Sequence, residues 1–120
     1  MRDFTVVETR TVGKFNIELA WTYDTLTLDH VFETEEDIAI HAKRCNEHTD
    51  THYVARVRAL YNGTEMGSAW LGSCYAYNCT PADDFEKEID GYLGQLIEEA
   101  IEEANINCKE LQKKLQEDFQ

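Results

Sequence analysis

The chain of 120 residues has little proline, no long apolar run and few basic residues. Proline occurs once and glycine six times, while apolar residues make up 42% and charged residues 29%. This composition is close to that of an ordinary globular protein, which excludes a collagen-like or wholly disordered chain. Nowhere does an uninterrupted apolar run approach the roughly 18 residues of a membrane-spanning helix. The length suffices for one hydrophobic core, so we expect a single domain over residues 1–120.

The scarcity of basic residues leaves the chain strongly acidic. There are 24 Asp and Glu against 11 Lys and Arg, a formal net charge of −13. Residues 81–120 alone hold twelve acids and four bases, whereas residues 43–80 hold three acids and four bases. Nucleic acids and anionic membranes are both bound through cationic surfaces. The composition therefore argues against direct binding to either.

The N-terminus shows no apolar leader of the kind that directs secretion, so we expect a cytoplasmic protein. In that compartment thiols stay reduced, which predicts free cysteines rather than disulfides. The four cysteines are Cys45, Cys74, Cys79 and Cys108.

Alternation of apolar and polar residues predicts strands in the N-terminal third. The clearest case is 15–23, where Phe15, Ile17, Leu19 and Trp21 occupy every second position. A weaker strand precedes it and is joined to it by a turn at 13–14. Alternation of Leu26, Leu28 and Phe32 suggests a third strand.

A helix and a hairpin follow. Thr34 and the three acids after it are typical of a helix N-terminus, and the helix is expected to end near His48. Residues 53–61 and 66–77 form the hairpin around Asn62-Gly63, a sequence that favours a tight turn. Glycines in the second strand, at Gly67 and Gly72, predict a bulge or a close approach by another element.

The last forty residues are predicted to be helical. Thr80 caps a helix with Pro81 at its first position, and the amphipathic pattern continues to Ala104. The apolar face contains Phe85, Ile89, Tyr92, Leu93, Leu96, Ile97 and Ala100. At 105–107 we expect a break and a second helix capped by Asn107, although one long helix with a coiled-coil seam through Cys108, Leu111, Leu115 and Phe119 is an alternative. The order of elements predicts an α+β fold: an antiparallel sheet of four to five strands with helices packed on one face in two layers, and a long C-terminal helix.

One cluster has the composition of a metal site. His41, Cys45, His48 and His52 are spaced by four, three and four residues, and zinc accepts imidazole and thiolate ligands. A helix core explains the first two equally well, and His52 is expected beyond the helix end. We therefore predict no metal and no other cofactor, and retain a small metal- or ligand-binding domain around this cluster as an alternative.

Catalytic motifs are missing from the sequence. There is no nucleophile elbow around a serine or cysteine and no glycine-rich phosphate loop. Carboxylates are so numerous that a pair of them carries no information about acid–base catalysis. The sequence therefore predicts a protein that is not an enzyme.

The polar face of the predicted C-terminal helix is the main candidate for a binding surface. Its glutamates have few lysines four residues away to relieve their repulsion, and Gly91 and Gly94 on the same side weaken the helix. Both features suit a surface that a protein partner covers, or a helix that bends. The predicted partner-binding residues are Asp84, Glu88, Glu98, Glu99, Glu102 and Glu103.

Two segments, 61–72 (YNGTEMGSAWLG) and 91–100 (GYLGQLIEEA), resemble small acidic uncharacterised proteins of phages and mobile elements. The resemblance covers the C-terminal half, and it implies a phage origin, in which small acidic proteins often inhibit host defence, as anti-CRISPR proteins do. Together with the charge, it predicts a non-enzymatic inhibitor that mimics DNA and binds the basic surface of a nucleic-acid-binding complex. A dimeric accessory protein, paired through the C-terminal helix, is a further alternative.

Overall fold

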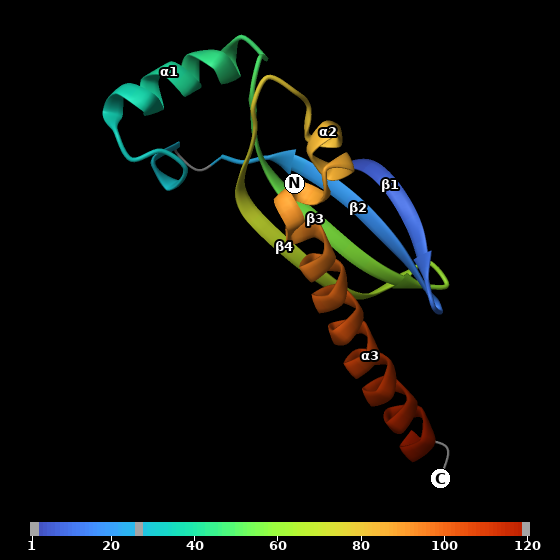
Figure 1. Ribbon diagram of the computed structural model, residues 1–120. Helices are drawn as coiled ribbons and strands as arrows, with labels where there is room; N and C mark the ends of the chain where they lie inside the picture. Colours follow the sequence, from blue (N-terminus) through green and yellow to red (C-terminus); the bar gives the residue numbers. More distant parts are fainter. Residues whose placement is uncertain (1–2, 26–27, 119–120) are drawn as a thin grey trace.

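The computed structural model describes residues 3–25 and 28–118 (Figure 1). Its elements are, in chain order, β1 (Thr5–Val12), β2 (Phe15–Tyr23), the 3₁₀ helix η1 (Leu28–His30), α1 (Glu35–Asn46), β3 (Thr51–Tyr61), β4 (Thr64–Ala76), α2 (Pro81–Glu86), the short turn η2 (Glu88–Gly91) and α3 (Tyr92–Asp118).

The four strands form an antiparallel sheet in the order β1-β2-β3-β4, which confirms the α+β prediction with four strands. On β2 the predicted alternation places Phe15, Ile17 and Leu19 in the core, each at most 3% exposed. The β3–β4 turn has φ of +49° at Asn62 and +81° at Gly63. Positive values at both central positions match the right-handed twist of a hairpin, which is why this dipeptide favours the turn.

One face of the sheet is covered by α3, which lies against β4 and β3 (Figure 1). The helix buries Leu93, Leu96, Ala100 and Ala104. Small residues let the two backbones approach: a Cβ built on Gly67 of β4 would lie 2.6 Å from the backbone nitrogen of Ala104. The predicted close approach at Gly67 is therefore confirmed.

The third predicted strand is wrong. Leu28 belongs to η1 and is buried there, while Leu26 lies outside the described residues. The carbonyl of Leu28 accepts hydrogen bonds from the N–H groups of Val31 and Phe32. The spacing of Leu28 and Phe32 therefore reflects a tight helical turn, because side chains four residues apart share a face in a turn as well.

The continuous helix predicted over 80–104 is interrupted. The capping box of Thr80 with Asp83 and the proline after it begin α2 as predicted, but α2 ends at Glu86. Three successive residues of η2, from Glu88 to Asp90, then have φ between +48° and +59°, and Gly91 has φ of +92°. This left-handed turn redirects the chain before α3 begins. The dipeptide Asp90-Gly91 is a typical turn sequence, and it is the local signal that could have indicated this break.

The break predicted at 105–107 is absent. These residues lie within α3, which is one helix of 27 residues. Asn107 caps no new helix. Its side-chain nitrogen instead donates a hydrogen bond to the carbonyl oxygen of Met66, at 2.6 Å. Met66 lies where the β3–β4 register shifts, so a bulge in the sheet provides the acceptor that holds the helix in place.

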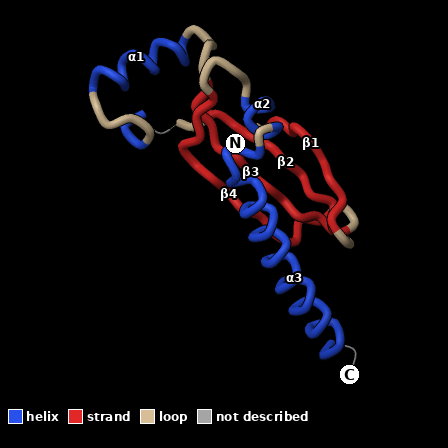
Figure 2. The backbone as a smooth tube through the Cα atoms, in the orientation of Figure 1, coloured by secondary structure: helices blue, strands red, loops and turns tan. Residues whose placement is uncertain are grey.

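Two helical segments extend away from the sheet (Figures 1 and 2). The first, α1, has no buried residue and lies beyond the end of the sheet, so its stripe of Ile38, Ala42 and Cys45 is only half-buried. The second is the distal half of α3, which carries Leu111 and Leu115 about half exposed. The molecule consequently measures 64 × 25 × 23 Å.

Candidate functional site

The acidic face of α3 consists of Glu98, Glu99, Glu102 and Glu103. All four side chains are exposed. Within the described ranges 3–25 and 28–118, none of the four glutamates forms an ion pair. Glu99 accepts a hydrogen bond from an uncharged side chain, from Gln95 Nε2 to Glu99 Oε1 at 3.1 Å. The chain has no lysine or arginine between Lys87 and Lys109. The acidic face is therefore a dense and uncompensated negative surface.

The charge density of the acidic face approaches that of DNA. Five residue steps separate its first and last glutamate, about 7.5 Å of helix axis. Four carboxylates over that length leave three intervals, which corresponds to one charge per about 2.5 Å of axis, against one per about 1.7 Å in duplex DNA. The helix is rigid at this point because its opposite side is packed on β4 through Ala100 and Ala104.

The other two predicted residues do not belong to this face. Asp84 lies in α2, half-buried, and accepts hydrogen bonds from the Tyr53 hydroxyl at 2.9 Å and the Cys79 thiol at 3.6 Å. Glu88 lies in η2 and forms an ion pair with Arg10 of β1 at 3.6 Å. The left-handed turn between α2 and α3 separates these two carboxylates from the four glutamates of the acidic face.

Positive charge on the other side of the sheet is neutralised within the molecule. Arg56 and Arg58 of β3 both donate to Glu18 of β2, at 2.9 to 3.0 Å. Hydrogen bonding to Arg58 lowers the pKa of Glu18, so this carboxylate stays charged. The Arg56 guanidinium also lies over the ring of Phe4, at 3.9 Å. Both arginines form ion pairs with Glu18, although the buried Arg56 Nε has no hydrogen-bond partner, and these pairs leave little positive potential to offset the acidic face.

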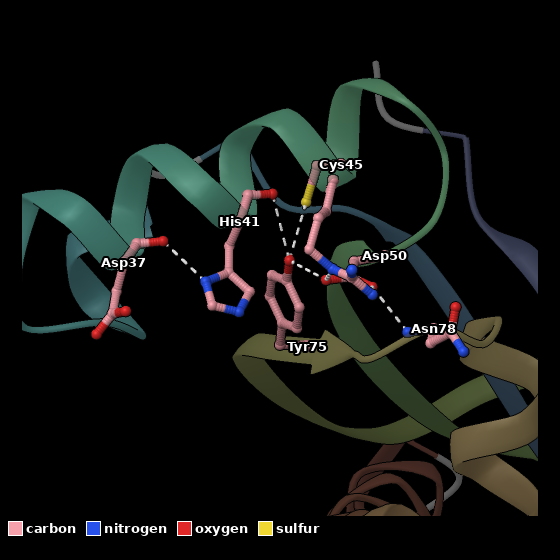
Figure 3. Close-up of polar contacts among 7 residues, drawn as sticks. Asp37, His41, Cys45, Asp50, Tyr75 and Asn78 are labelled. Atoms are coloured by element: carbon pink, nitrogen blue, oxygen red, sulfur yellow. Dashed lines mark hydrogen bonds and ion pairs between the residues drawn. The ribbon is translucent and has the colours of Figure 1, made fainter.

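His41 and Cys45 contact different groups. Figure 3 shows His41 on α1 with its Nδ1 within 2.8 Å of the Asp37 carbonyl, and its ring stacks on Phe32 with centroids 3.9 Å apart. The Cys45 thiol donates to the Tyr75 hydroxyl at 3.6 Å. Packing and hydrogen bonds in the chain account for both residues, but neither lies in a helix core as expected, because α1 has no buried residue and both are only half-buried.

The two remaining histidines point elsewhere. His48 follows α1 with φ of +60° and is exposed, whereas His52 is buried on β3 with its Nε2 3.5 Å from Asp24 Oδ2. Among the residues that the structure describes, no three His, Cys, Asp or Glu side chains are grouped so as to hold a metal ion. The four predicted ligands are therefore not brought together, and the alternative of a metal domain centred on them has no geometric support.

Asp50, which the sequence did not single out, joins α1 to the sheet (Figure 3). Its fully buried carboxylate accepts two hydrogen bonds from Arg44, at 2.8 and 3.0 Å, and one each from the Tyr75 hydroxyl and the Asn78 N–H, both at 2.7 Å. Burial alone would raise the pKa of Asp50, but the hydrogen bonds outweigh it and lower the pKa to about 2. One carboxylate thus fixes the helix end, the sheet and the loop after β4.

Two of the thiols, Cys74 and Cys79, are poorly suited to nucleophilic chemistry. Burial raises the pKa of Cys74 to about 11, and burial followed by repulsion from Asp84 raises the pKa of Cys79. Because the thiolate is the nucleophile, both groups are held in the unreactive protonated form at neutral pH.

The chain matches no protein-family model, no curated protein and no solved structure. Within the described residues, no helix is both long and apolar enough to cross a membrane.

Proposed function

We propose that this protein is a non-enzymatic binding protein that occupies a basic, nucleic-acid-binding surface of another protein through the acidic face of α3. The observation that carries the proposal is the density of exposed, unpaired carboxylates on a rigid helix. An isolated helix with this sequence would be destabilised by its own repulsion. A cationic groove relieves that repulsion and recognises a comparable charge spacing in DNA.

The proposal has a narrower form, in which the partner belongs to a host defence complex and the protein acts in the cytoplasm of an infected cell. The resemblance of 61–72 and 91–100 to phage proteins supports the origin. The four cysteines are free, as expected in a reducing compartment.

The test replaces all four glutamates of the acidic face with glutamine, and we call this protein the quadruple variant. Glutamine keeps the shape and the helix propensity of glutamate. A matched control carries Glu33→Gln, Glu35→Gln, Glu36→Gln and Glu47→Gln, which removes the same charge from exposed positions in and around α1. Each protein is immobilised and exposed to a bacterial lysate, and retained proteins are then challenged with duplex DNA.

The expected result is a partner that the parent and the control retain, that the quadruple variant loses, and that duplex DNA displaces. Binding should also weaken steeply as salt rises, since exposed charges are screened. Equal retention by the quadruple variant, or a partner that holds DNA and this protein together, contradicts the proposal.

A dimeric accessory protein is the second candidate, favoured by the distal half of α3. Leu111 and Leu115 are 49% and 48% exposed there, on the stripe that packs against the sheet further up the helix. Sedimentation equilibrium tests this directly. A dimer that Leu111→Glu dissociates supports pairing through the helix, and a monomer at all concentrations excludes it.

A further inference from the structure

A cavity of 460 Å³ opens between the end of β4, α2 and the turn that precedes α3. Its lining includes four tyrosines, Tyr53, Tyr75, Tyr77 and Tyr92, and two carboxylates, Asp84 and Asp90. No local sequence pattern joins this set, because its members come from β3, β4, the loop after β4, α2, η2 and α3. The cavity is distinct from the acidic face of α3.

Two of the tyrosines that line this cavity are exposed. Tyr77 and Tyr92 are 56% and 55% exposed, although each has a large apolar ring, while Tyr53 is fully buried. Tyr75 lies against Tyr77 with ring centroids 4.6 Å apart. Exposed tyrosines around a concave site are typical of binding surfaces, since they supply large contact area at a low entropic cost.

Two carboxylates give the cavity an electrostatic preference. Asp84 is oriented by the Tyr53 hydroxyl and the Cys79 thiol, which both donate to it, and a carboxylate can accept further hydrogen bonds. Asp90 lies in the left-handed turn, with φ of +53°. Among the described residues that line the cavity, Lys87 is the basic one, so negative charge predominates there.

The backbone of η2 is what brings these groups together. Left-handed conformation costs about 1 kcal/mol or more for a residue with a Cβ, and Ile89 is β-branched, for which it is rarer still. The burial of Ile89 in the core, at 8% exposure, compensates for part of this cost. Without the turn, α2 would run on as a helix and would not place Asp90 and Tyr92 at the cavity.

We propose that this cavity binds the guanidinium group of an arginine side chain. A planar cation stacks on tyrosine rings and donates in a fork to carboxylates, and the lining of the cavity contains four tyrosines and two carboxylates. The inference rests on the proposed function in one respect only, namely that the arginine belongs to the basic partner. Binding of the side chain itself is a property of the isolated protein.

The experiment titrates ¹⁵N-labelled protein with N-acetyl-arginine methylamide and follows backbone amide shifts. The neutral isostere N-acetyl-citrulline methylamide controls for shape. Saturable shifts should centre on Gly72, Ser73, Asp90 and Tyr92, with citrulline about tenfold weaker, as expected for the loss of one cation–π or charge-assisted contact. Shifts spread evenly over the acidic surfaces, or equal binding of citrulline, would overturn the assignment.

Variants locate the site. Tyr92→Leu and Asp90→Asn should each weaken arginine binding about fivefold to tenfold; leucine is compatible with the helix and asparagine with the left-handed turn. Tyr23→Leu, at a tyrosine 61% exposed but outside the cavity, is the matched control and should bind like the parent.

The quadruple variant separates the two proposals. It should retain arginine binding at the cavity even where it loses the protein partner. Unchanged binding by Tyr92→Leu and Asp90→Asn refutes the cavity site and leaves the acidic face untouched. Failure to find a partner displaced by DNA refutes the proposed function and leaves the cavity titration unaffected.

Discussion

Replacing Gly67 with alanine tests how closely α3 approaches the sheet. The new Cβ would lie 2.6 Å from Ala104 N and closer still to Ala100 O. Both are backbone atoms of α3, so no side chain can rotate away to make room. Gly67 has no positive φ, and its backbone would accept alanine without strain. Steric overlap is therefore the only cost of the substitution.

The overlap can be removed only by moving the helix. Ordinary contact begins near 3.4 Å, so α3 must shift by roughly 1 Å and loosen the packing of Leu93, Leu96, Ala100 and Ala104. Overpacking of this kind costs about 1–3 kcal/mol. In a chain of this size each kcal/mol lowers the melting temperature by about 4 °C, so we expect a loss of about 4–12 °C.

Urea unfolding followed by circular dichroism measures the free energy of unfolding, and an unchanged m-value shows that the folded state stays compact. Gly72→Ala on the same strand is the matched control, since its Cβ would meet no atom closer than Asp24 Oδ2, at 3.8 Å. It should be neutral or about 0.5 kcal/mol stabilising. If the two variants are equally stable, the described contact between β4 and α3 is wrong.

Three further predictions concern charge and the helix termini. Because the folded pKa of Asp50, about 2, lies below its ordinary value of 3.8, its contribution of roughly 2 kcal/mol is complete above about pH 4 and is lost as the pH falls towards 2. Urea unfolding from pH 2 to 6 should show a loss of stability that is larger in the parent than in Asp50→Asn by roughly 2 kcal/mol, since other carboxylates with a lowered pKa, such as Glu18, titrate in both proteins. The quadruple variant should be as stable as the parent or about 0.5–1 kcal/mol more stable at low salt, with the difference shrinking in 0.5 M salt; a loss would mean that the glutamates are paired. Gly94→Ala, at an open helical position, should stabilise the protein by about 0.5–1 kcal/mol, whereas Gly91→Ala should destabilise it by about 1 kcal/mol, because Gly91 has φ of +92°. Thermal melts compare these two, and the reverse order would contradict the described turn.

The elements with strong local patterns were predictable from the sequence. Alternation identified β2, the Asn62-Gly63 turn identified the β3–β4 hairpin, and the capping residues Thr34 and Thr80 identified the starts of α1 and α2. In each case a few neighbouring residues determine the local structure. The cause is an alternation of period two in β2, a positive φ in the turn, and a side chain that accepts a hydrogen bond from a backbone N–H at the helix starts. The four glutamates of the acidic face could be predicted equally well from the sequence, since residues four apart on one helix lie on the same side.

The errors arose where contacts distant in sequence decide. Asn107 has the local character of a helix cap, but the carbonyl of Met66 at the sheet bulge offers its side chain a stronger partner, and the helix continues. Glu88 falls on the predicted acidic face, but the left-handed turn moves it towards Arg10. Burial of Ile89 in the core helps to offset the conformational cost of that turn. This burial depends on residues distant in the sequence, so no local pattern indicates it.

The sequence by itself therefore determined the class of fold, the hairpins and the excess of negative charge, because periodicity, turn chemistry and composition are local properties. Only the tertiary structure decided which carboxylates lie together. In that structure the four glutamates of the acidic face lie on one helix, whereas Asp84 lies in the lining of a tyrosine-containing cavity. The tertiary structure also made Asp50 the buried link between α1 and the sheet. The reason is that a carboxylate's surroundings are set by which elements pack beside it, and packing joins residues that are far apart in the chain.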